Sequence, residues 1–430
     1  MGTFSLDPDQ SAWCAELRGL ARQHLAPLAE KGEPGRVNRP LVAELGRLGL
    51  LERLFTSGAL DLCLMRESLA QVSTEAETAL ALQGLGAHPV HAYGTEPQRT
   101  HWLPEVRAGR AVAAFALSEP AAGSDAAALE LRAQEQPRQG RGELREQPQA
   151  PRKGRGELRD QPRRDPHAPT ANEPRQGRGE LRDQPRRDEH PPTHTWLLTG
   201  EKTWISNAPE ADFYTVFART GPPESRAGGV TAFLVPADRP GLTGTPLDML
   251  SPHPIGTLTF DEVPVTEADV LGEPGQGFRV AMNTLNLFRP SVGAFALGMA
   301  QAALEATLAH TARREAFGGP LKDLQTVAHQ VADMALRVES ARLMVYAAAS
   351  AYDEGADGVP GRAAMAKLLA TETAQHVVDT AVQLHGARAL RRGHLLEHLY
   401  REVRAPRIYE GASEIQRAII ARELYKEAAR

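Results

Sequence analysis

Apolar residues recur at helical spacing through the first quarter of the chain. They recur in two stretches at positions that fall on one face of a 3.6-residue helix. These positions are Ala15, Leu17, Leu20, Ala21, Leu25 and Leu28, followed by Leu41, Leu45, Leu48 and Leu50. The pattern predicts an N-terminal α-helical domain over residues 1–112.

The pattern changes between Val112 and about Pro264. Two short segments, 213–218 and 230–235, are rich in β-branched and aromatic residues and are bounded by Gly and Pro, which predicts strands. After Gly277 the helical period returns in long Ala- and Leu-rich segments. We therefore expect an α+β multidomain protein with a central β domain over residues 113–265 and a C-terminal α-helical domain over residues 266–430.

Residues 134–190 break this order. A twelve-residue unit begins at Pro137, Pro151 and Pro174, and the segment contains no aromatic residue, Val, Ile or Met. Such a composition cannot bury enough apolar surface to offset the entropy of ordering, so we expect a low-complexity disordered insertion at the tip of a β-hairpin. The 14 Lys and Arg residues of this segment raise the alternative of a nucleic-acid-binding arm. Its 11 Asp and Glu residues, however, cancel most of the positive electrostatic field that binding to a phosphate backbone requires.

Composition limits the cellular compartment and the classes of binding partner that we expect. Hydrophobic residues make up 41% of the 430 positions, and the net charge of −5 is too small to imply a nucleic-acid or membrane partner for the whole chain. Two cysteines imply no disulfide framework. The first seven residues lack the basic flank and apolar core of a signal peptide, and no uninterrupted apolar run is long enough to span a bilayer. We expect a cytoplasmic protein.

The segment 407–417 carries the candidate chemistry. Glu410 stands between the apolar pair Ile408-Tyr409 and Gly411, and Ser413 is placed to cap the helix that follows. A carboxylate held against apolar neighbours has its charged form disfavoured, which tunes a base to take a proton from carbon. Read alone, the segment also fits a surface glutamate beside an ordinary helix cap.

This segment resembles the catalytic-base motif of the acyl-CoA dehydrogenases, FAD-dependent enzymes that desaturate acyl thioesters between Cα and Cβ. Four further segments resemble motifs of that family in the same order: two flavin motifs at 114–125 and 198–207, and two adenosine-binding stretches at 314–318 and 383–386. Apart from the insertion, the resemblance runs from about residue 10 to the end. It implies a flavin lying between the β domain and a four-helix-bundle-like C-terminal domain.

The resemblance also implies roles for single residues. Glu410 would take the α-proton while a hydride passes from Cβ to flavin N5, and the alternative base of some family branches is replaced by Phe288. Substrate contacts fall to Ser124, Arg289 and Gly411, with Arg289 at the CoA end. The implied FAD contacts are Phe115, Leu117, Ser118, Gly123, Ser124, Trp204, Ile205, Ser206, Arg314, Phe317, Gln325, Gln383, Gly386, Ser413 and Glu414.

The implied partners are an acyl-CoA substrate, an electron-transfer flavoprotein as electron acceptor, and further copies of the chain in a homodimer or homotetramer. Gln383 and Gly386 would reach the FAD of a neighbouring subunit. The stretch 386–390 lacks two glycines that the family usually has, and Leu50–Leu62 replaces an acidic, aromatic, double-glycine loop. These departures leave tight FAD binding and the acyl length open. They also allow a second hypothesis, a non-dehydrogenating flavoprotein that binds nucleic acid.

One motif points elsewhere. His394 and His398 have the spacing of a zinc-protease helix. They lie on a Leu-rich stretch where the resembled family has a packing helix, so we expect no metal.

Overall fold

The computed structural model describes residues 6–136 and 194–429. The N-terminal part is helical, as predicted, and Asp7 and Gln10 form a capping box at the start of its first helix. A π-helical turn, Ala21–Leu25, joins the first two helices. The helices are α1 (Pro8–Leu20), α2 (Ala26–Ala29), α3 (Arg39–Arg47), α4 (Leu50–Thr56), α5 (Ala59–Ala70), α6 (Thr74–Tyr93) and α7 (Glu96–Arg107).

The middle part is a seven-stranded sheet with the order β1-β4-β2-β3-β7-β6, and β5 pairs with β4. The strand β1 runs parallel to β4, whereas β2 and β7 run antiparallel to β3. Side chains that alternate inward from these strands bury an apolar core around Trp196 and Phe233. The strands are β1 (Ala113–Ala116), β2 (Arg132–Glu135), β3 (Thr195–Ser206), β4 (Phe213–Arg219), β5 (Val230–Pro236), β6 (Leu242–Pro246) and β7 (Ile255–Thr266).

The strands that flank the predicted insertion pair with each other. Glu135 lies opposite Trp196, and the Gln136 N–H donates to the Thr195 carbonyl at 2.9 Å. The hairpin expected at this junction is therefore present. Strand β2 includes Gln134 and Glu135, so the sheet extends two residues into the stretch that the sequence assigned to the insertion. The predicted disordered insertion otherwise falls within residues 137–193, which lie outside the described residues.

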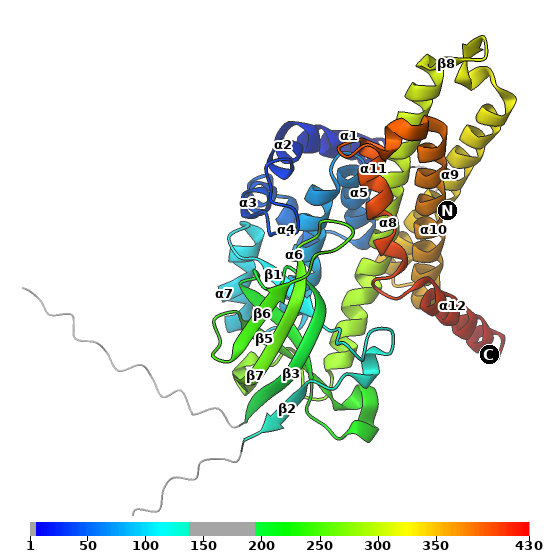
Figure 1. Cartoon of the computed structure of the whole chain (residues 1–430). Coiled ribbons are helices and arrows are strands. Elements are labelled where there is room, and N and C mark those ends of the chain that lie inside the picture. Colours follow the sequence, from blue (N-terminus) through cyan, green and yellow to red (C-terminus); the bar gives the residue numbers. More distant parts are fainter. Residues whose placement is uncertain (1–5, 137–193, 430) are drawn as a thin grey trace, which may run out of the picture. The chain divides into compact units, whose positions relative to one another are not determined.

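The C-terminal part is helical, with one two-stranded hairpin, β8 (Glu315–Ala316) and β9 (Gly319–Pro320). Its helices pack through small side chains such as Ala300, Ala349 and Ala370, which allow the backbones to approach closely. They are α8 (Gly277–Arg313), α9 (Gln325–Asp353), α10 (Val359–His385), α11 (Leu395–Glu402) and α12 (Ser413–Ala428). Helix α8 runs from the sheet past α5 and α6 to the hairpin (Figure 1).

Helix α8 is apolar enough, by length and composition, to cross a membrane, which the search for uninterrupted apolar runs did not detect. In its most apolar window, 72% of the residues are buried inside the protein, as in the core helix of a soluble fold. Among the described residues no other helix meets the same criterion.

Candidate active site

Glu410 lies in a turn between α11 and α12, and its backbone conformation is unusual. Its φ is +50° and that of Gly411 is +93°, both in the left-handed region that few residues other than glycine adopt. Three hydrogen bonds hold the turn. The Gln416 side-chain amide donates to the carbonyls of Glu410 at 3.1 Å and Gly411 at 2.8 Å, and the Lys367 ammonium donates to Gly411 at 2.8 Å. The surrounding structure therefore fixes a strained conformation at this carboxylate.

The Glu410 carboxylate is surrounded by cations. Burial raises its pKa, and the positive charges of Arg66, Arg289 and Lys367 oppose that rise. Its Oε2 atom is buried without a hydrogen-bond partner among the described residues. Burial also lowers the pKa of Lys367 to about 8, against the attraction of Glu410. A buried, unpaired carboxylate with a shifted pKa beside three cations is typical of a site that moves protons.

Arg289 lies beside this carboxylate. Its side chain is buried, one guanidinium N–H donates to Asn286 at 2.9 Å, and Nε has no partner among the described residues. Burial lowers its pKa, and Glu410 opposes that shift. The guanidinium is thus within electrostatic reach of the base, a position that the CoA-end role implied by the resemblance did not specify.

Phe288 occupies the position of the alternative base and is packed into the core. Its ring meets His88 edge-on at 6.1 Å, and a Cβ added at Gly84 would lie 2.7 Å from it. No carboxylate is available at this position of α8. Glu410 is the carboxylate that the site offers.

Replacing Gly411 with alanine should displace the Glu410 carboxylate. The new Cβ would lie 2.5 Å from the Gln416 amide nitrogen that holds the turn, in addition to the strain of a positive φ. We expect a loss of kcat of about tenfold to a hundredfold, because small misplacements of a reacting group have effects of that size. The matched control is Gly393→Ala, at φ +83° with nothing within 4 Å of the new Cβ. Equal losses in the two variants would show that backbone strain alone is responsible.

The two flavin motifs predicted from sequence lie together. The Thr203 N–H donates to the Ser118 carbonyl at 3.0 Å, and the buried Lys202 ammonium donates to the Leu117 carbonyl at 2.9 Å and to Glu119 at 2.7 Å. Burial lowers the pKa of Lys202 to about 8, while Glu119 favours the charged form. This buried contact joins the loop after β1 to strand β3.

Trp204 projects from that strand with 54% of its surface exposed and a φ of +59°. The pairing of β3 with β7 is irregular between Lys202 and Ile205, which frees the intervening backbone from the ladder. The next residue, Ile205, is buried, and Ser206, the last residue of β3, is half-buried. An exposed indole next to a hydroxyl, on a rigid strand, suits a flat aromatic group such as isoalloxazine.

Other residues of the first motif have mixed positions. The Phe115 ring is half-buried and packs against Phe217, with the ring centres 4.9 Å apart. Gly123 and Ser124 lie on an exposed loop before Asp125, which pairs with Arg226 at 3.1 Å.

The residues implied for the adenosine end of FAD gather elsewhere. Arg314 follows the end of α8, Phe317 is 91% exposed at the hairpin tip, and Gln325 begins α9. Gln383 and Gly386 lie at the end of α10, which the stacked rings of His310 and His385, 4.1 Å apart, join to the end of α8. Figure 1 shows this group at the far end of α8 from the sheet, and a helix of 37 residues extends about 55 Å. One chain does not bring the two groups together.

One prediction near Glu410 is wrong, the helix cap assigned to Ser413. Ser413 does not cap α12: Ala412 holds the cap position, and the Ser413 hydroxyl is buried and donates to Glu372 at 2.6 Å. Glu372 also pairs with Arg407 at 2.8 Å, so Ser413 is part of a structural contact, while Glu414 is exposed. In the altered 386–390 stretch, Ala389 is fully buried in the helical core.

The two histidines with zinc-protease spacing have structural contacts. His394 caps α11 by accepting the Leu396 N–H at 3.1 Å, and His398 lies 2.6 Å from the Thr74 hydroxyl. Within residues 6–136 and 194–429, no group of three His, Cys, Asp or Glu side chains is placed to hold a metal ion.

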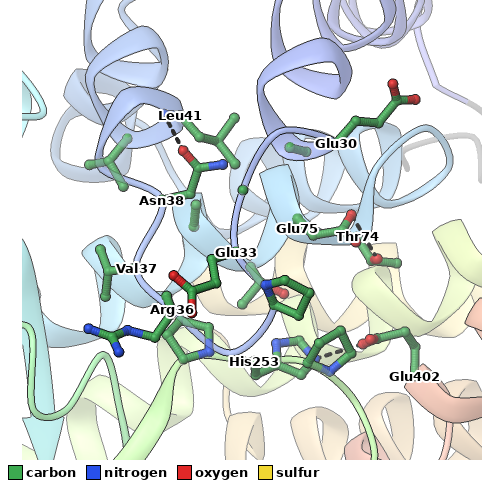
Figure 2. Close-up of a pocket in the computed structure, with 18 of the residues that line it drawn as sticks. Glu30, Glu33, Arg36, Val37, Asn38, Leu41, Thr74, Glu75, His253 and Glu402 are labelled. Carbon is green, nitrogen blue, oxygen red and sulfur yellow. Dashed lines mark hydrogen bonds and ion pairs between the residues drawn. The ribbon is translucent and has the colours of Figure 1, made fainter. Parts of the chain in front are cut away.

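The sequence does not predict the cavity of about 300 Å³ that lies among the N-terminal helices, the 252–254 loop and α11. It is bounded by the α2–α3 connection, the start of α6, the 252–254 loop and α11. His253 hydrogen-bonds Glu402 across it at 2.6 Å, and Glu30, Glu33 and Glu75 line other parts of its wall (Figure 2). The sequence offered little signal for this cavity, because its walls come from four separate segments.

Comparison with known proteins finds relatives that match this chain over most of its length. The chain matches the family described as "Acyl-CoA dehydrogenase, N-terminal domain" over residues 7–110, the corresponding middle domain over residues 182–263 and the C-terminal domain over residues 275–425. It is 30% identical to the probable acyl-CoA dehydrogenase FadE25 of Mycobacterium tuberculosis, over 98% of this chain and 97% of that protein.

Two solved structures extend the comparison. A chain described with the electron transferring flavoprotein of Acidaminococcus fermentans has a TM-score of 0.79 and 28% identity, over 98% of this chain and 99% of that one. A chain from the FAD complex of PigA has a TM-score of 0.79 and 25% identity, over 99% of both chains.

Proposed function

The chain belongs to the acyl-CoA dehydrogenase family, whose cofactor is FAD, and from that premise we propose that Glu410 is its catalytic base. The observation that carries the proposal is the Glu410 carboxylate: its Oε2 atom is buried without a hydrogen-bond partner among the described residues, its pKa is raised, and its backbone is held in a strained turn. Such a group can accept the α-proton of an acyl thioester.

Trp204 and Ser206 would hold the flavin ring, with Ser118 and the backbone of Leu117 at its polar edge. When bound, FAD supplies the acceptor for the β-hydride. The Lys202 ammonium holds these two segments in place, because it hydrogen-bonds the Leu117 carbonyl and Glu119 of the first segment from strand β3 of the second. The chain's own contribution is thus a rigid platform on the sheet and a proton acceptor on the helical side.

The cations around Glu410 have a second effect. Loss of the α-proton leaves negative charge on the thioester, and preorganised positive charge in a buried site stabilises it. Arg66, Arg289 and Lys367 supply that field. The Glu410 N–H would bond the thioester oxygen, as the family resemblance implies.

The pH dependence follows from the raised pKa. Glu410 must be ionised to accept a proton, so kcat/KM should fall as pH drops through a pKa above the ordinary carboxyl value of about 4.3. Initial rates of acyl-CoA-dependent dye reduction between about pH 5 and pH 9 measure this. An acid limb at the ordinary value would show that burial does not control the base.

The reaction itself is tested by adding acyl-CoAs to the purified yellow protein with an artificial electron acceptor. Bleaching of the flavin by at least one acyl-CoA, and formation of the 2-enoyl-CoA product, are expected. A stable flavoprotein that none of a broad acyl-CoA panel bleaches would exclude the dehydrogenase.

We also propose that the working form is a dimer or tetramer and that an electron-transfer flavoprotein takes the electrons. The first proposal is supported by the distance between the two groups of FAD residues in one chain, and by exposed apolar side chains in the C-terminal part of the chain. These include Phe317 (91% exposed), Leu336 (66%) and Leu390 (70%). The second is supported by the family and by the similar chain described with an electron transferring flavoprotein.

A further inference from the structure

Glu372 of α10 contacts both ends of the segment that carries Glu410. Its Oε2 atom lies 2.8 Å from the Arg407 guanidinium, and its Oε1 atom accepts a hydrogen bond from the Ser413 hydroxyl at 2.6 Å. Arg407 stands three residues before Glu410, and Ser413 stands three residues after it. One carboxylate therefore joins the two ends of the segment 407–413, which we call the Glu410 loop.

The backbone of the Glu410 loop has a conformation that needs support from other elements. The loop connects the short helix Ala405–Arg407 to α12, and both Glu410 and Gly411 have a positive φ. A residue other than glycine stays in the left-handed region only where the surrounding structure over-determines its conformation. If those contacts were lost, the backbone at Glu410 could relax to an ordinary negative φ and move the carboxylate.

A second residue of α10 holds the same loop. Lys367, five residues before Glu372, is fully buried and donates to the Gly411 carbonyl at 2.8 Å. Helix α10 therefore contacts the Glu410 loop at both ends and beside Glu410 itself. This helix packs against α8 and α9, so it is a rigid support on which a reacting group can be held precisely.

The charge state of Glu372 suits it to bind two donors. An ionised carboxylate only accepts hydrogen bonds, so each of its oxygens can bind one end of the loop. Burial favours a higher pKa for Glu372, but the hydrogen bonds from Ser413 and Arg407 outweigh that effect, and the pKa is lowered. The pKa of Glu410 is raised. As pH falls, Glu410 therefore takes up a proton before Glu372 does, and the loop stays closed while Glu410 titrates.

We propose that Glu372 is a positioning residue for the reaction, which holds the Glu410 carboxylate in place for proton removal by joining both ends of its loop. The inference rests on the proposed dehydrogenase function and deepens it. Glu372 acts on the reacting atoms through the position of Glu410. Loosening either end of the loop should therefore slow proton removal more than it weakens substrate binding.

Two variants test the two contacts. Glutamine at position 372 has one acceptor oxygen and one donor amide, so in Glu372→Gln the side chain cannot accept from both ends of the loop. Ser413→Ala opens one end and leaves every charge in place. In each variant kcat per bound flavin should fall about tenfold or more with little change in KM, because small misplacements of a reacting group have effects of that size.

The pH profile separates a misplaced Glu410 from a general loss of stability. Burial raises the pKa of Glu410, so a looser loop that admits water should lower it, and the acid limb of kcat/KM should move to lower pH. Ser413→Ala is decisive here, since Glu372→Gln also removes a charge. A measurement independent of turnover is hydrogen exchange, which should become faster at the amides of residues 408–412 in both variants.

The matched control is Asp379→Asn, which neutralises an exposed carboxylate on the same helix. Its kcat, its pH profile and its exchange at residues 408–412 should equal those of the wild type. Flavin content and the melting temperature verify that each variant is folded. If Glu372→Gln does not fold, Ser413→Ala decides, because it removes a single hydroxyl.

The possible failures are distinguishable. Folded variants whose kcat per bound flavin and loop exchange match those of the wild type overturn this inference and leave the proposed function intact. Faster exchange without a loss of kcat also overturns it, because order in the loop would then not control the reaction. A wild type that no acyl-CoA bleaches overturns the proposed function, whatever the exchange rates are.

Discussion

Replacing Glu410 with glutamine should lower kcat by about 10³-fold, because general-base catalysis contributes between about 10² and 10⁴. Glutamine keeps the shape of the side chain and cannot take a proton. The turn that holds the residue is fixed through backbone carbonyls, by Gln416 and Lys367, and these bonds do not depend on the carboxylate. The variant should therefore fold, bind FAD and bind acyl-CoA.

The measurement is kcat and KM with a bleaching acyl-CoA, together with flavin content. A large loss of kcat with little change in KM is expected, since the interaction removed acts mainly in the transition state. The control is Glu427→Gln, an exposed carboxylate on α12. Activity close to the wild type in Glu410→Gln would remove Glu410 from the role of base.

Replacing Lys202 with methionine should have the largest effect on stability. Lys202 is fully buried, and its partner Glu119 also accepts the N–H groups of Glu130 and Leu131 at 2.5 and 3.0 Å. Without the ammonium, Glu119 becomes a buried charge without a counterion, which costs about 3–5 kcal/mol of unfolding free energy. The contact that ties the Leu117 carbonyl to β3 is lost at the same time.

Urea denaturation measures the first effect and the ratio of flavin to protein after gel filtration measures the second. Both should fall in Lys202→Met. The adjacent Glu201→Gln changes an exposed side chain on the same strand and should alter neither. If the variant kept full stability but lost its flavin, Lys202 would act on the cofactor rather than on the fold.

Local patterns were sufficient to predict the order of the domains. The apolar period of 3.6 before residue 112 and after residue 277, and the β-branched runs between them, follow from local sequence, and the helices and strands appear there. The local pattern around Glu410, an apolar pair, a glycine and a helix start, made it a candidate, and the resemblance to the base motif of the family selected it.

The groups that tune the base could not be predicted in this way. Lys367 lies 43 residues before Glu410, and Arg66 lies on a different domain, so only the fold brings them together. One signal was present: Arg66 interrupts an otherwise apolar face of α5 that includes Met65 and Leu69. The prediction that Ser413 caps α12 was wrong for a similar reason. Its hydroxyl donates instead to the charged carboxylate of Glu372, which lies 41 residues earlier in the chain.

The most direct test of the central claim is anaerobic mixing of the purified protein, in a stopped-flow spectrometer, with an acyl-CoA that bleaches its flavin. The rate constant for the decay of flavin absorbance should be lower when the α-hydrogens of the substrate are replaced by deuterium. In Glu410→Gln it should be about 10³-fold lower than in the wild type. Equal decay rates in the wild type and in Glu410→Gln would contradict proton removal by Glu410.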